Sequence, residues 1–223
     1  GLLVVFFTVG TVGCAREQSS STRPTRSADS EYDFIRDGQT SYRILVPATA
    51  TETETYGAGE LVYFIERATG VELPIVYDDK VSAEKDGKFL SVGNTTLFER
   101  SDVNVSLSEL GDDGFKVVTY GQSVLMNGAS ESGKLYAVYE FLEEQFHWEV
   151  YAADEIYIDN VQNAKLKDFQ IVEKPDFSGR DSHNNSYSYD STFSVRKRQT
   201  GVTTSFSPDV ALLLNLQADH LDR

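Results

Sequence analysis

The strongest structural signal in the sequence is an amphipathic segment at residues 133–150, GKLYAVYEFLEEQFHWEV. A stripe of this kind has to be buried against another element. Two β-rich runs at residues 115–119 and 123–126 precede it and flank a short turn, which predicts a β-hairpin. We therefore expect a helix packed on a sheet. The apolar side chains at helical spacing are Leu135, Val138, Tyr139, Leu142 and Phe146.

Similar signals extend this pattern over residues 41–175, which we expect to form one α/β (α+β) domain. Strands are predicted at residues 41–47, 71–79, 88–95, 155–160 and 166–175, and helices at residues 54–70 and 95–100. Gly70 is the expected stop of the first long helix. The predicted fold is a mixed β-sheet with two main helices packed on it.

The N-terminus carries a short apolar run, Leu2–Phe7, which is too short to span a bilayer and is typical of a secretory signal. Small residues then lead to Cys14, the only cysteine of the chain. This order resembles a bacterial lipobox, so we expect residues 1–14 to be a lipoprotein signal peptide and Cys14 to carry the lipid. An ordinary signal peptide or a short membrane anchor is the alternative.

The residues that follow are polar and Ser-rich, and we expect residues 15–40 to be a flexible tether. The chain has a formal net charge of −15. Nucleic-acid binding is disfavoured, because it relies on a basic face. Signal, tether and acidic domain together predict a protein lipid-anchored on the extracellular face of a bacterial membrane, with the membrane as one of its partners.

The turn before the long helix resembles a phosphate-binding loop, because Gly128, Gly133 and Lys134 match G-x-x-x-x-G-K. Such a loop needs Ser or Thr next, and this chain has Leu135, which belongs to the apolar stripe. We therefore expect a tight strand-to-helix turn, with Ser132 near the helix N-cap, and no nucleotide or other cofactor.

Read at full length, residues 114–155 resemble the accessory domain that precedes the barrel in bacterial α-glucuronidases. The second domain of β-N-acetylhexosaminidases has the same architecture. Upstream, residues 60–76 resemble the helix, glycine stop and strand of that domain, and residues 91–94 its next strand end. The same domain occurs in uncharacterised glycosidase-like surface lipoproteins. The motif G-x-x-Y-[GA]-[VI]-Y-x-[FL]-L-E is matched by Gly133, Tyr136, Ala137, Val138, Tyr139, Phe141, Leu142 and Glu143.

The resemblance implies that residues 176–223 begin a truncated catalytic (β/α)8 barrel. Arg180 matches an arginine of the first barrel strand that binds sugar hydroxyls, although Asp181 stands where the family usually has Gly. A structural ion pair is the alternative for Arg180. Arg196 and Arg198 either approach an acidic sugar or lie on a solvated helix. Trp148, past the long helix, is the best candidate among the aromatics to face a sugar or the barrel.

Glycoside hydrolysis needs two carboxylates flanking the scissile bond, and in the resembling families both lie deeper in the barrel. Asp112–Asp113 and Glu143–Glu144 are adjacent pairs that we interpret as solvated charge, and His147 as structural. We therefore assign no catalytic residue and no metal ligand. The expected function is that of a non-catalytic accessory domain of a surface-anchored, α-glucuronidase-like enzyme of polysaccharide degradation, whose partners are its own barrel and an oligo- or polysaccharide.

Two other classes remain open at this stage. A substrate-binding lipoprotein of a carbohydrate importer would also combine a lipobox, a tether and α/β domains, and would continue into a second lobe with hinge crossings. A structural surface module is the other. A glycosidase would instead continue into βα units with Asp or Glu at strand ends.

Overall fold

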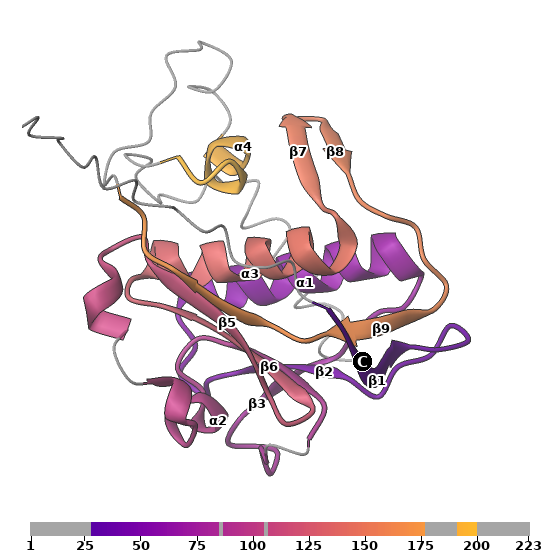
Figure 1. The fold of residues 1–223 in the computed structure, drawn as a ribbon, viewed down its shortest axis with the longest axis horizontal. Coiled ribbons are helices and arrows are strands. Elements are labelled where there is room, and N and C mark those ends of the chain that lie inside the picture. The colour runs from indigo at the N-terminus through magenta and orange to yellow at the C-terminus, as the bar shows by residue number, and fades with distance from the viewer. Residues whose placement is uncertain (1–27, 85–86, 105–106, 177–190, 200–223) are drawn as a thin grey trace, which may run out of the picture.

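The computed structural model describes residues 28–84, 87–104, 107–176 and 191–199. A six-stranded mixed sheet forms its centre, in the strand order β10-β5-β6-β4-β2-β3. Two long helices, α1 and α3, lie side by side on one face of this sheet (Figure 1). This arrangement confirms the predicted α/β class and the two main helices.

The sheet is parallel on one side and antiparallel on the other. Its parallel strands are β3 (Ile75–Tyr77), β2 (Arg43–Val46), β4 (Phe89–Val92) and β6 (Ser123–Gly128). Strand β5 (Phe115–Tyr120) forms the predicted hairpin with β6, and β10 (Gln170–Glu173) pairs with β5 in antiparallel orientation. All six residues of β6 are buried, as expected of a central strand covered on both faces.

Helix α1 (Glu52–Thr69) begins at a complete capping box. The Thr51 side chain accepts a hydrogen bond from the Glu54 backbone N–H, and the Glu54 carboxylate accepts one from the Thr51 backbone N–H. The helix ends at Gly70, whose φ of 72° is left-handed. The predicted stop is thus confirmed.

Helix α3 (Glu131–Phe146) is capped by Ser130, two residues before the expected Ser132. His147 ends it in a left-handed conformation, with φ 51°. The expectation that the helix runs to residue 150 is therefore wrong. Residues Glu149–Ala152 instead form strand β7, which pairs with β8 (Glu155–Tyr157) in a hairpin that stands above the helices in Figure 1.

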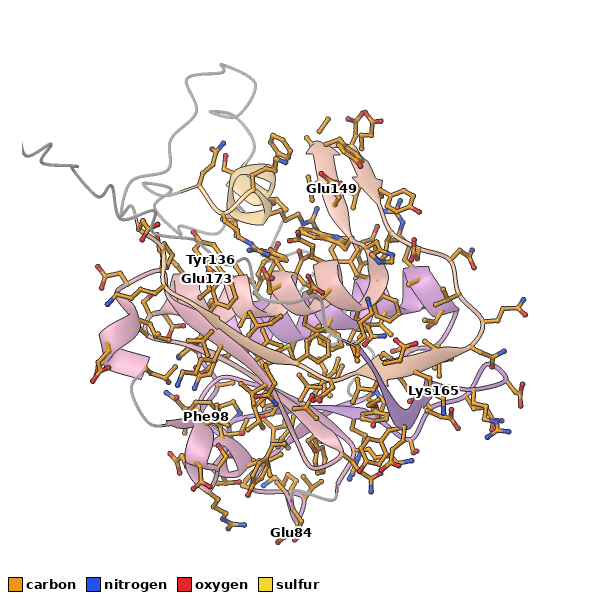
Figure 2. All side chains as sticks on the ribbon, in the orientation of Figure 1. Glu84, Phe98, Tyr136, Glu149, Lys165 and Glu173 are labelled. Atoms are coloured by element: carbon orange, nitrogen blue, oxygen red, sulfur yellow. The ribbon has the colours of Figure 1, made fainter. Side chains whose placement is uncertain are left out.

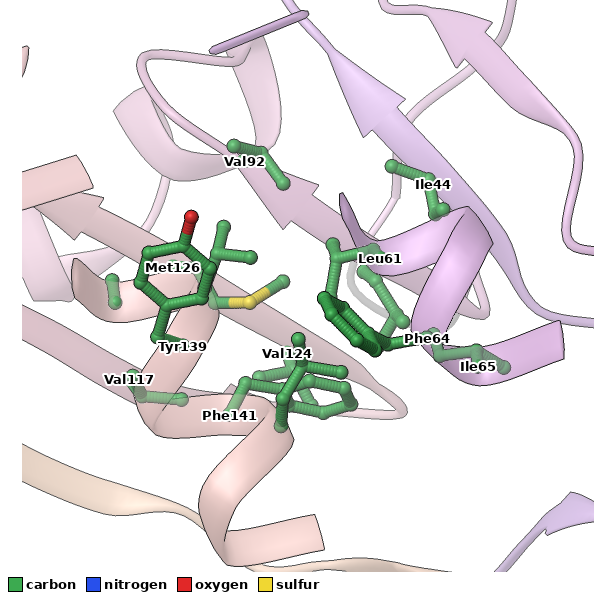
Figure 3. Close-up of a cluster of buried hydrophobic side chains, with 14 of the residues drawn as sticks. Ile44, Leu61, Phe64, Ile65, Val92, Val117, Val124, Met126, Tyr139 and Phe141 are labelled. Atoms are coloured by element: carbon green, nitrogen blue, oxygen red, sulfur yellow. The ribbon is translucent and has the colours of Figure 1, made fainter. Parts of the chain in front are cut away.

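The main core lies between the sheet and the two long helices (Figure 3). Leu61 and Phe64 of α1 and Tyr139 and Phe141 of α3 are fully buried there. Burying one such side chain stabilises the fold by about 1.5–3 kcal/mol. The other sheet face carries a smaller cluster built on Leu45, Phe89 and Leu125. It is covered by α2 (Thr96–Glu99) and neighbours the 3-10 turns η1 (Asp102–Asn104) and η2 (Leu107–Leu110).

The domain begins earlier than expected. Residues Asp29–Ile35 form strand β1, which pairs with β9 (Ala164–Lys167), and Phe34 and Ile35 are each 1% exposed. The predicted tether is therefore wrong for residues 29–40, because the apolar pair at its end belongs to the core. The rest of the predicted signal and tether, residues 1–27 with Cys14, lies outside the described residues.

One further helix, α4 (Ser191–Arg196), lies near β7 and above the long helices (Figure 1). It falls in the stretch expected to open the barrel, and the remainder of that stretch lies outside the described residues. Within the described ranges, no helix is long and apolar enough to cross a membrane.

Candidate docking interface

The turn that resembles a phosphate loop is closed by ion pairs. The Lys134 ammonium lies 2.8 Å from Glu54 Oε1 and 2.6 Å from Glu131 Oε1. Burial opposes its charge, but the hydrogen bonds that it donates to Glu131 and Glu54 outweigh that and raise the pKa of Lys134. Thr51 also donates to Glu131, at 2.6 Å. A phosphate would have to displace two carboxylates, one of them buried, so the cluster joins the starts of α1 and α3 and does not fit a phosphate.

A second charged cluster lies where α4 meets α1. The Arg196 guanidinium binds the Glu60 carboxylate through two nitrogens, both at 2.8 Å. The Arg196 side chain is 11% exposed and that of Glu60 is 4% exposed. A planar fork on a carboxylate is the strongest form of side-chain ion pair, and this one is withdrawn from water.

Tyrosines complete the surroundings of Glu60. The Tyr139 hydroxyl donates to Glu60 Oε2 at 3.1 Å. Burial first, and the Glu60 charge second, raise the pKa values of Tyr56 and Tyr139, so both hydroxyls keep their protons at neutral pH. Arg196 also lies 5.1 Å from the centre of the Phe64 ring, at cation–π distance. The Glu60 carboxylate is thus fully engaged by its neighbours.

Arg198 forms a second attachment, this time to α3. It lies 2.8 Å from Glu140 Oε2 and 3.1 Å from Glu143 Oε2, and 5.6 Å from the centre of the Phe115 ring. Between the two arginines, Lys197 is exposed. Two alternating arginines therefore attach α4 and its C-terminal turn to both long helices. We name this region the α4 interface; it consists of Glu60, Phe64, Phe115, Tyr139, Glu140 and Glu143 on the domain, with Arg196 and Arg198 on the segment that follows.

The α4 interface corrects two sequence-based interpretations and adds one residue. Arg196 and Arg198 neither approach a sugar nor lie on a solvated helix, because both are paired with carboxylates of the domain. Glu143 is not simply solvated charge, because it is one of those partners. Glu60 was not singled out from the sequence, although its place beside the apolar stripe of α1, one turn before Phe64, is a recognisable signal for a buried, paired charge.

Trp148 lies next to this interface, in the core. It is 4% exposed, its ring stacks on Tyr139 with centroids 5.0 Å apart, and Phe64 meets it edge-on at 5.4 Å. This position does not fit the sugar contact expected for Trp148, because a sugar stacks on an exposed ring face. Its role here is core packing.

The remaining expected site residues have different outcomes. His147 is held by Asp159, with Nδ1 and Oδ2 2.6 Å apart, in line with the structural role expected for it. Asp112 and Asp113 lie in the turn before β5. Arg180 and Cys14 lie outside the described residues, so their sugar-binding and lipid-carrying roles stay predictions.

The fold and the α4 interface define an α/β domain that holds the chain segment following it. Residues 33–141 match the family model described as "Glycosyl hydrolase family 67 N-terminus". The expected relation to the N-terminal domain of α-glucuronidases is thus confirmed over this segment, which is a glycoside hydrolase-related domain.

Solved structures show a more distant similarity. The GH20 β-N-acetylhexosaminidase from Streptomyces coelicolor A3(2) is 15% identical, with a TM-score of 0.42, over 69% of this chain and 26% of that one. A β-hexosaminidase variant from Streptomyces plicatus, in complex with its product GlcNAc, is 12% identical, with a TM-score of 0.39, over 69% and 26%. The chain thus spans 26% of the length of each of these structures. No curated protein matches the chain.

Proposed function

We propose that this chain is the accessory front part of an α-glucuronidase-like glycoside hydrolase, and that its α1–α3 face fixes the start of the catalytic domain. The observation that carries the proposal is the Arg196–Glu60 pair, which is buried at the junction with the segment that follows the domain. A buried, forked ion pair sets one orientation, because any displacement leaves a charge without its partner.

The domain itself takes no chemical step in this proposal. Its most buried interface carboxylate, Glu60, is bound by an arginine and a tyrosine, and so has no free oxygen to act as nucleophile or general base. Hydrolysis would be performed by two carboxylates of the catalytic domain, on an oligo- or polysaccharide. Arg180 would contact the sugar at the first barrel strand.

The proposed location is the extracellular face of a bacterial membrane, with the lipid on Cys14. Support comes from the sequence alone: an apolar run, small residues and a single cysteine stand ahead of a polar stretch. An enzyme held in this way would work on polysaccharide close to the cell surface.

Hydrogen exchange on the full chain tests the docking role. With both Arg196→Ala and Arg198→Ala, we expect the backbone amides of residues 197–199, which donate within α4 and its last turn, to exchange on the order of a hundredfold faster. The matched control is Lys197→Ala, which removes an exposed cation between them and should leave exchange unchanged.

The proposal fails if the double arginine variant exchanges at these amides as slowly as the parent chain does. The same preparation of the parent chain should show no turnover of aryl glycosides. Measurable hydrolysis would overturn the non-catalytic role even if α4 stays docked.

A further inference from the structure

The β7–β8 hairpin exposes two aromatic rings that no core contact accounts for. Tyr151 and Tyr157 are 54% and 52% exposed, the former being among the most exposed large apolar side chains of the described residues. In Figure 1 the hairpin stands clear of the sheet, and Figure 2 shows Glu149 on it. We name the outer surface formed by Glu149, Tyr151, Tyr157 and Asp159 the hairpin face.

The strand pairing of Tyr157 and a side-chain contact of Tyr151 put both rings on the same side of the hairpin. Glu149 is opposite Tyr157, and Val150 is opposite Ile156. Val150 and Ile156 point inward, because Val150 is buried in the main core and Ile156 packs against it. The register shifts between Val150 and Ala152, where Tyr151 lies, but the Tyr151 hydroxyl contacts Glu149, the residue opposite Tyr157. Both rings therefore adjoin Glu149 on the outer side of the hairpin, where one extended ligand can reach them.

Hydrogen bonds hold each ring by its hydroxyl. Tyr151 donates to Glu149 Oε2 at 2.8 Å, and Tyr157 donates to Asp159 Oδ1 at 2.9 Å. These bonds raise the pKa values of both tyrosines, so the donors stay protonated at neutral pH. The other oxygen of Asp159 is bound by His147. The rings are thus oriented without being buried, which lowers the entropy cost of binding a ligand on them.

Hydrogen bonds attach the hairpin to the two long helices. The Arg67 guanidinium of α1 donates to the Ile156 carbonyl at 3.0 Å, and the Asp159 backbone N–H donates to the Phe146 carbonyl at 2.9 Å. Helix α4 contacts β7. The hairpin face therefore adjoins the α4 interface, beside the segment that we propose leads into the catalytic domain.

The negative charge of the hairpin restricts the class of ligand that it can bind. Residues 149–159 contain four carboxylates and no lysine or arginine, so an anionic ligand would be repelled. Tyrosine rings supply an apolar surface, and the flanking carboxylates supply acceptors for hydroxyl groups. A neutral sugar chain has both complementary features, namely apolar C–H faces and many hydroxyl donors.

We propose that the hairpin face binds a neutral oligosaccharide, with sugar rings stacked on Tyr151 and Tyr157 and hydroxyls donated to Glu149. The site would hold a polysaccharide next to the catalytic domain. The proposal rests on the proposed function only for the choice of a sugar as ligand, since the geometry of the face is independent of it.

Isothermal titration of the full chain with neutral hexasaccharides tests this site. The probes are xylohexaose, cellohexaose and chitohexaose, with hexagalacturonate as the anionic comparison. We expect at least one neutral probe to bind with a Kd below about 1 mM and hexagalacturonate not to bind. Tyr151→Ala and Tyr157→Ala should each weaken binding about fivefold or more, whereas Tyr151→Phe, which keeps the ring, should weaken it less.

Tyr77→Ala is the matched control, because Tyr77 is 37% exposed but lies on edge strand β3 of the main sheet, and it should leave affinity unchanged. The proposal is overturned if no neutral probe binds, or if binding survives in the Tyr151→Ala, Tyr157→Ala double variant. Self-association of the chain that the double variant abolishes, without sugar binding, would assign the face to a protein contact and also overturn it. The arginine variants remove no residue of this face, and the tyrosine variants remove no residue of the α4 interface, so the two proposals fail separately.

Discussion

Lys134 shows how one residue can satisfy a nucleotide-binding pattern and still serve only packing. Its side chain is 9% exposed and that of its partner Glu54 is 3% exposed. The Lys134→Met substitution keeps most of the apolar stem but leaves the Glu54 charge buried without a cation. We expect the free energy of unfolding, measured by urea titration at pH 7, to fall by about 3 kcal/mol.

Two controls separate this effect from general sensitivity to lysine loss. Lys80→Met removes an ion pair with Asp79 in which the lysine is 73% exposed, and should leave the urea midpoint unchanged, because water screens an exposed pair. Combining Lys134→Met with Glu54→Leu should restore much of the loss, because no unpaired charge remains. Unchanged stability of the Lys134→Met variant would contradict the role of Lys134 in joining the starts of α1 and α3.

At the residue scale, the sequence patterns indicate which charged side chains matter better than they indicate which residues pair with them. The sequence argues against a phosphate loop at Lys134, because that motif requires Ser or Thr directly after the lysine and such a requirement can be read from adjacent residues. The partners of Arg196 lie 136 residues away, and those of Arg198 lie 55 and 58 residues away. Local patterns carry no information on such pairs, so both arginines remained open between a sugar and solvent.

At the element scale, the close contact between β6 and α3 depends on Gly128. A Cβ added there would lie 2.2 Å from the Gly133 carbonyl carbon, which is backbone and cannot rotate away. Gly128→Ala should therefore push the start of α3 off the sheet and lower the free energy of unfolding by about 1–3 kcal/mol or more.

Gly38→Ala is the comparison for this substitution. Gly38 has open space around it but a φ of 70°, so only backbone strain of about 1–2 kcal/mol should appear. Thermal unfolding, monitored by circular dichroism, shows which of the two variants loses more stability. A Gly128→Ala protein as stable as the parent chain would show that α3 can shift without cost.

Helices and strands were predictable where the spacing of apolar residues along the chain shows a helical or strand period. Helix α1 with its Gly70 stop and the β5–β6 hairpin follow from local spacing and turn residues. Strand β7 was assigned to the helix before it, because α3 ends at His147 in a left-handed conformation that usually needs glycine. Strand β1 was missed because its partner β9 is more than a hundred residues away.

At the scale of the whole molecule, sequence and structure differ on the residue at which the folded domain starts. Sequence composition puts the boundary near residue 41, whereas the family match begins at residue 33 and β1 begins at Asp29. Phe34 accounts for the difference, because its ring packs against Tyr42 at 5.1 Å and Phe141 at 6.3 Å. A short polar stretch therefore encloses a strand that the core needs.

Two N-terminal deletions decide between these boundaries. Removing residues 1–27, which are the expected leader and the first part of the expected tether, should leave the urea midpoint unchanged. Removing residues 1–40 also takes away β1 with Phe34 and Ile35, each 1% exposed, and should cost about 4 kcal/mol or more, because deleting one buried phenylalanine side chain alone typically costs 3–5. The two proteins differ by only 13 residues (28–40), so equal midpoints would show that β1 is dispensable and that the domain starts where composition puts it.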